Sequence, residues 1–110
     1  MILYNVTVNI DKDVHEEWLQ WMKEKHIPDV MSTGIFIENK MNRILTGEQE
    51  GGVSYAIQYL CESEEKLKEY EEKYAPALQE EHTKKFQGKF GAFRTIMEVV
   101  HREEYNSSDK

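Results

Sequence analysis

A histidine and two tryptophans stand close together in this chain, directly before a proline. Trp18, Trp21 and His26 precede Pro28, and helical spacing puts all three on the apolar side of one helix. A half-buried imidazole titrates near neutral pH and can donate or accept a proton, so His26 is the candidate catalytic acid or base. The alternative is a structural histidine that contacts the last carbonyl groups of its helix.

The two tryptophans have two possible roles. Trp18 and Trp21 are three positions apart, so both indoles point to the same side of the helix. They could stack against a small organic ligand and form one wall of its site. The alternative is that they fill the core between helix and sheet.

Polar residues elsewhere complete the candidate ligand site. Asn5 and Thr7 share one face of the first strand, His82 lies late in the chain, and Arg94 lies on the last strand. Arg94 can hold an anionic group by a forked contact, and His82 could join His26 through the fold. The alternatives are a hydrated dimer interface or solvent exposure for Asn5 and Thr7, and an ion pair with one of 21 acidic residues for Arg94.

The sequence favours neither a metal site nor a cofactor. His15 and His26 are eleven positions apart, which is about 16 Å along a helix, and no pair of histidines has the spacing of a zinc-binding helix. The single cysteine, Cys61, has no basic neighbour to lower its pKa. Phosphate-loop and nucleophile-elbow motifs are missing from the sequence.

Periodicity predicts the elements that position these residues. Residues 2–10 and 53–61 alternate apolar with polar side chains, as strands do. An amphipathic helix starts near Asp11 or Asp13, and Pro28 is expected to end or kink it before a turn closed by Gly34. Residues 35–46 predict a second strand and residues 47–52 a hairpin turn.

The second half of the chain repeats this order. Ser63 is expected to cap a second helix, Pro76 to bend or restart it, and Gly88 to stop it, before a last strand over residues 92–101. The order β-α-β-β-α-β predicts an α+β, ferredoxin-like fold, with two helices on one face of a four-stranded antiparallel sheet. We expect one domain over residues 1–101 and a polar, mobile tail over residues 102–110.

Composition limits the partners. A net charge of −7 opposes binding to nucleic acid and to anionic membranes. No stretch approaches the roughly 20 apolar residues of a membrane span, and the N-terminal residues do not form a secretion signal. One cysteine fits a cytoplasmic protein. The uncovered sheet face predicts a homodimer that pairs sheet to sheet.

Several motifs resemble a small bacterial family known as domain of unknown function 4286. The matching stretches are 4–8, 18–30, 74–78 with His82 and Phe86, and 93–95. The resemblance implies a dimeric α+β barrel and carries no established activity. More loosely, the step His26-Ile27-Pro28 is similar to part of the wider dimeric α+β barrel group, which includes cofactor-free monooxygenases.

These observations leave three classes of function. The first is a cytoplasmic homodimer that binds a small organic ligand or acts as an assembly module. The second is a cofactor-free enzyme of monooxygenase or isomerase type with His26 as acid or base. The third is a regulatory domain that binds another protein through an exposed apolar patch.

Overall fold

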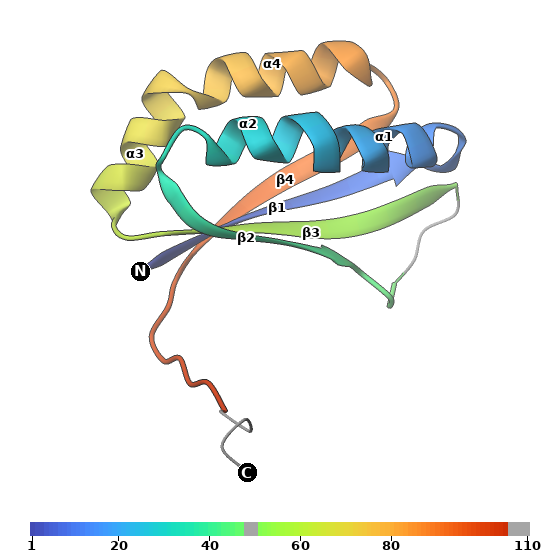
Figure 1. Ribbon diagram of the computed structural model, residues 1–110. Helices are drawn as coiled ribbons and strands as arrows, with labels where there is room; N and C mark the ends of the chain where they lie inside the picture. The colour runs from blue at the N-terminus through green and yellow to red at the C-terminus, as the bar shows by residue number, and fades with distance from the viewer. Residues whose placement is uncertain (48–50, 106–110) are drawn as a thin grey trace.

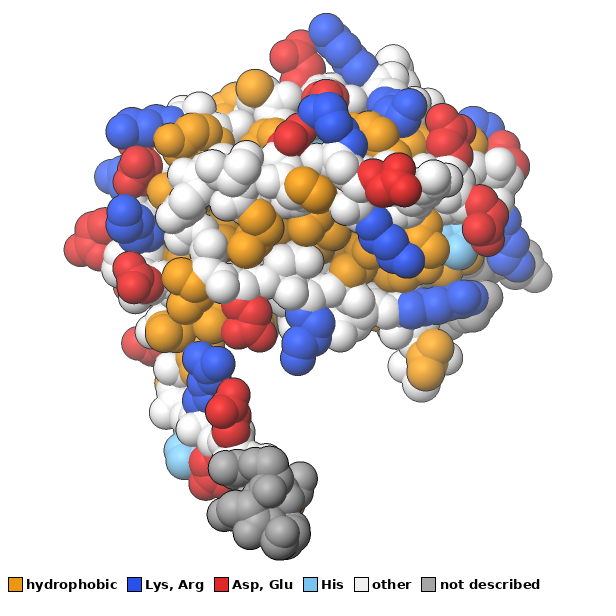
Figure 2. All heavy atoms as spheres, viewed as in Figure 1, with side chains coloured by type: hydrophobic (Ala, Val, Ile, Leu, Met, Phe, Trp, Pro, Cys, Tyr) orange, Lys and Arg blue, Asp and Glu red, His pale blue; other side chains and the backbone are white. Residues whose placement is uncertain are grey.

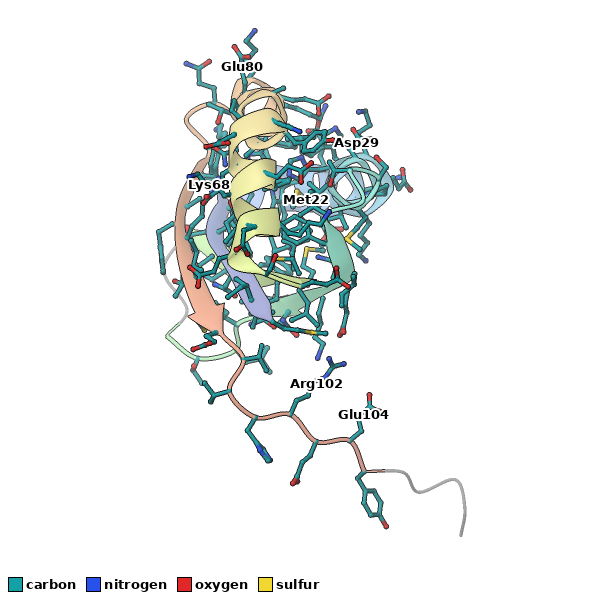
Figure 3. All side chains as sticks on the ribbon, turned by 90° about the vertical axis from the view of Figure 1, so that its left-hand side faces the viewer. Met22, Asp29, Lys68, Glu80, Arg102 and Glu104 are labelled. Carbon is teal, nitrogen blue, oxygen red and sulfur yellow. The ribbon has the colours of Figure 1, made fainter. Side chains whose placement is uncertain are left out.

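The protein forms one four-stranded antiparallel sheet with its helices on a single face. A computed structural model describes residues 1–47 and 51–105. The strands are β1 (Ile2–Asp11), β2 (Phe36–Arg43), β3 (Gly52–Cys61) and β4 (Phe90–Glu98), in the spatial order β2-β3-β1-β4. Figures 1 and 3 show the helices above one side of the sheet. The predicted ferredoxin-like fold is confirmed.

The central strand β1 explains where the core lies. Its alternation points Ile2, Tyr4, Val8 and Ile10 toward the helices, where all four are buried. It pairs with β3 on one side and β4 on the other. The helix-facing side of the sheet therefore forms the floor of any cavity between the sheet and the helices.

The first helical arm is continuous from His15 to Met31, after a short 3-10 turn, η1 (Lys12–Val14). It consists of α1 (His15–Trp21), the π-helical turn η2 (Met22–His26) and α2 (Ile27–Met31). Of the two alternatives predicted for Pro28, an end of the helix is wrong, since Pro28 lies in the first turn of α2. The N–H of Ile27 bonds to the carbonyl of Met22, five residues back. The wider turn directly precedes Pro28, which has no N–H to donate, and the helix continues past the proline.

The second helical arm follows its prediction closely. Its helices are α3 (Glu64–Lys73) and α4 (Ala75–Lys85), and Pro76 lies in the first turn of α4, so the predicted restart is confirmed. Ser63 caps α3, because its hydroxyl accepts the N–H of Lys66 at 3.2 Å. Gly88, at φ 77°, turns the chain toward β4.

Strand boundaries differ from prediction by a few residues. β2 is shorter than the expected 35–46, and β4 begins and ends before the expected 92–101. Of the predicted hairpin turn 47–52, residues 48–50 lie outside the described residues, as do 106–110 of the predicted tail. Residues 102–105 form neither helix nor strand and extend away from the sheet (Figure 1).

One face of the molecule mixes both signs of charge. Figure 2 shows basic and acidic side chains interspersed, with apolar groups between them. Within the described residues, no helix is long and apolar enough to cross a membrane.

Candidate functional site

A partly open cavity of about 210 Å³ lies between the sheet and the two helical arms. Its floor comes from β1, β3 and β4, and its roof from η2, α2, α3 and α4. The lining residues are Tyr4, Val6, Val8, Met22, His26, Val30, Ile57, Tyr59, Tyr70, Leu78, Gln79, His82, Thr83, Phe90, Ala92 and Arg94. Three of the predicted site residues, His26, His82 and Arg94, thus meet in one cavity.

The π-helical turn places His26 at the cavity wall. Met22, at the start of η2, is buried on the inner side of the arm, whereas Asp29 lies on its outer side (Figure 3). His26 ends η2, and its ring stacks on Trp21 with ring centroids 5.2 Å apart. Its Nδ1 atom is buried and has no hydrogen-bond partner among the described residues. Burial lowers the pKa of His26, against the opposing effect of Glu81 and Asp29, so the neutral imidazole is favoured.

A hydrogen bond from Trp18 fixes the tautomer of His82. The indole N–H of Trp18 donates to Nε2 of His82 at 2.9 Å, so this nitrogen carries no proton. The neutral ring then carries its proton on Nδ1. Burial, with smaller contributions from His26 and Arg94, lowers the pKa of His82 to about 4.

The tryptophans stand behind the histidines rather than in the cavity lining. Trp18 is fully buried in the core, and Trp21 packs edge-on against Phe86 and also contacts the rings of His26 and His82. Both therefore orient an imidazole. That they also bind a ligand stays a prediction.

Arg94 brings the positive charge of the site. Its Nε–H donates to the hydroxyl of Tyr4 at 3.0 Å. Within residues 1–47 and 51–105, no carboxylate lies within 4.0 Å of its guanidinium, so the alternative of an ion pair is not seen in this part of the chain. Arg94 belongs to the exposed edge strand β4 and therefore stands at the mouth of the cavity.

Tyrosine hydroxyls were not part of the predicted site. Tyr4, Tyr59 and Tyr70 line the cavity, and burial raises the pKa of each, which keeps the hydroxyls protonated. The sequence signal was present in β1 and β3, where Tyr4 and Tyr59 occupy helix-facing positions. Their place in one cavity with Arg94 needed the pairing of strands that are distant in sequence.

Asn5 and Thr7 lie on the opposite face of the sheet. The amide of Asn5 donates to the hydroxyl of Thr7 at 2.9 Å, and Asn9 pairs in the same way with Ser54. Because alternate strand residues face opposite sides, these two residues cannot reach the cavity of His26. Their predicted ligand-binding role therefore belongs to the uncovered face and stays a prediction.

The described residues offer little other chemistry. They contain no group of three His, Cys, Asp or Glu side chains able to hold a metal ion. Cys61 is buried, and burial raises the pKa of its thiol, which disfavours the reactive thiolate. The cavity is therefore the strongest candidate site in this part of the chain.

Comparison with known proteins assigns the chain to a family. The model of the domain of unknown function DUF4286 matches residues 1–100. The chain belongs to the DUF4286 family. No curated protein matches this DUF4286 chain significantly.

Solved structures share its fold at low identity. A dimeric ferredoxin-like protein from an uncultured marine organism is 15% identical, with 96% of this chain and 100% of that chain covered and a TM-score of 0.67. HapK from Hahella chejuensis is 6% identical, covering 96% and 99%, with a TM-score of 0.70. A candidate antibiotic biosynthesis monooxygenase from Bacillus cereus is 11% identical, covering 94% and 97%, with a TM-score of 0.66. Such likeness shows the ferredoxin-like fold but does not show a shared activity.

Proposed function

We propose that this DUF4286 protein binds a small organic ligand in the cavity bordered by His26. The observation that carries the proposal is the buried Nδ1 atom of His26, which has no hydrogen-bond partner among the described residues. An unsatisfied buried polar group costs about 1–3 kcal/mol. A ligand that hydrogen-bonds this nitrogen removes that cost. The polar atom in the cavity wall therefore favours binding of such a ligand.

The size and lining of the cavity favour a ligand with a single ring or a short branched chain. Cavities of roughly 150 Å³ hold benzene, and this one measures about 210 Å³. Apolar groups such as Val6, Ile57 and Leu78 would contact the body of the ligand. The few polar groups would fix its orientation, as in most small-molecule sites.

A fragment screen by protein-observed NMR tests the proposal. We expect fragments of one-ring size to shift the signals of His26 and His82, and the variant His26→Gln to weaken their binding at least fivefold. His101→Gln is the matched control, because His101 lies in the exposed C-terminal segment. Fragments that shift no signal of the cavity residues would contradict the proposal.

A cofactor-free enzyme is the second candidate, and the state of His26 favours it. Its lowered pKa keeps the imidazole neutral near pH 7, which is the form a general base needs. The base would remove a proton from carbon next to a carbonyl group, leaving the electron pair on an enolate oxygen. This step would open an isomerase-type or cofactor-free monooxygenase-type reaction of a carbonyl substrate.

Exchange of ligand protons with solvent separates the two candidates. Ketone fragments that bind the cavity are incubated in D₂O, and loss of their α-proton signal is followed by NMR. Catalysed exchange that disappears in His26→Gln supports the enzyme. Binding without catalysed exchange supports a binding protein alone.

We further propose that the protein is a homodimer that pairs through the uncovered sheet face. Phe93 and Met97 are 62% and 37% exposed there, and exposed apolar side chains on a sheet favour a partner. The dimeric ferredoxin-like structures with the same fold support this arrangement. The assembly-module function and the regulatory domain that binds another protein would use the same surface, and cytoplasmic location stays a prediction.

A further inference from the structure

We propose that the ligand of this cavity is a small organic acid bound as its anion, with its acidic group at Arg94 and, at the other end of its apolar body, a polar group that hydrogen-bonds His26. This inference rests on the proposed function, since it assumes that the cavity binds a ligand. It adds the charge and the orientation of that ligand.

The charges of the cavity lining favour an anionic ligand. Among the lining residues, Arg94 is the one residue that is always charged, and the lining contains no aspartate, glutamate or lysine. A cationic head group would therefore face a guanidinium with no carboxylate beside it. An anion would face the positive charge of Arg94, which has no ion-pair partner among the described residues.

The orientation of Arg94 also favours an anionic ligand. Its Nε–H is held by the Tyr4 hydroxyl at 3.0 Å, which orients the guanidinium. The two terminal nitrogens make no hydrogen bond with another described residue and remain available as a fork. Carboxylates and similar planar anions fit such a fork with two parallel hydrogen bonds.

The other polar groups of the cavity can donate hydrogen bonds as well. The hydroxyls of Tyr59 and Tyr70 make no hydrogen bond with another described residue, and both residues are buried. His82 adds the proton that its bond with Trp18 places on Nδ1. A cavity rich in donors suits a ligand that presents acceptor oxygens.

Nearby carboxylates lie outside the cavity, and two of them pair with a lysine. Asp29 and Glu81 act on His26, and both pair with Lys25, the latter at 3.5 Å. Glu71 acts on Tyr4 but does not line the cavity. These groups leave Arg94 as the charge that a ligand meets.

Matched acid and amide probes test the inference. One-ring aryl carboxylates with a hydroxyl on the far side of the ring, such as 4-hydroxybenzoate and 3-(4-hydroxyphenyl)propanoate, are titrated against their neutral carboxamides by NMR at pH 7. We expect the acids to bind at least about tenfold more tightly than the amides, as a charge-assisted forked contact provides. Acids and amides that bind equally would overturn this inference and leave the proposed function standing, whereas cavity signals that move with neither class would overturn both.

Variants of Arg94 locate the selectivity. Arg94→Gln should remove the preference for acids over amides. Arg94→Lys should keep part of this preference, because the charge remains without the fork. Arg102→Gln is the control, since Arg102 pairs with Glu38 outside the cavity. Tyr4→Phe should lower the preference severalfold, because Tyr4 positions the guanidinium. An acid preference that survives Arg94→Gln would overturn the assignment.

Discussion

Trp18 is fully buried, and its indole N–H finds an acceptor in the ring of His82, 64 positions away. Trp18→Phe removes the donor and leaves Nε2 of His82 unsatisfied. We expect a loss of about 1–3 kcal/mol in the free energy of unfolding beyond the effect of the smaller ring, measured by urea denaturation. Trp21→Phe is the comparison, because the Trp21 indole N–H makes no hydrogen bond with another described residue. Equal losses in both variants would refute a special role for the Trp18 hydrogen bond.

His82 also makes stability depend on pH. Its pKa is about 4 in the folded protein and 6.5 in the unfolded chain, so the unfolded state binds more protons between these values. Stability is therefore fully present above pH 6.5 and falls as the pH drops toward 4, by about 3 kcal/mol from this group. Urea denaturation at pH 7 and pH 4.5 measures the change.

A matched variant isolates this contribution. His82→Gln keeps an acceptor for Trp18 and cannot titrate, so its stability should fall less than that of the wild type over the same interval. His101→Gln, with the histidine exposed, should behave like the wild type. Parallel loss in all three proteins would show that His82 does not titrate as its burial requires.

Among the elements, the π-helical turn η2 does most to build the site. It adds a residue to the helix between Met22 and Ile27, and both Met22 and His26 line the cavity. The same turn lets Pro28 continue the helix into α2. A single wide turn therefore explains both the position of His26 and the failure of the predicted stop.

The second helical arm depends on its N-terminal cap. Ser63→Ala removes the hydroxyl that accepts the N–H of Lys66. We expect a loss of about 1 kcal/mol in the free energy of unfolding, measured by urea denaturation. Ser32→Ala provides the control, since the Ser32 hydroxyl donates to a helix-end carbonyl at an exposed position. A variant of Ser63 as stable as that of Ser32 would refute the cap.

The whole molecule has one covered and one uncovered sheet face. In Phe93→Glu, a charge replaces an exposed apolar side chain on the uncovered face. We expect the proposed dimer to dissociate at least tenfold more readily. Light scattering over a dilution series measures this change. Ile96→Glu places the same charge on the other side of β4, where Ile96 is 53% exposed, and should leave the dimer intact. Dissociation by Ile96→Glu alone would place the interface elsewhere.

The sequence by itself determined the order of elements, the face of β1 that is buried, the Ser63 cap and the restart at Pro76. These features depend on local rules, namely alternation of side chains, capping and the missing N–H of proline. It also predicted His26, His82 and Arg94 as site residues, because few other side chains carry suitable chemistry.

Only the tertiary structure decided which of these residues meet. Tyr4 and Arg94 become neighbours through antiparallel pairing of the first and last strands, and Trp18 reaches His82 across two helical arms. Asn5 and Thr7 are separated from the cavity because the sheet stands between them. Such contacts depend on strand register and helix packing over the whole chain, which no local pattern specifies.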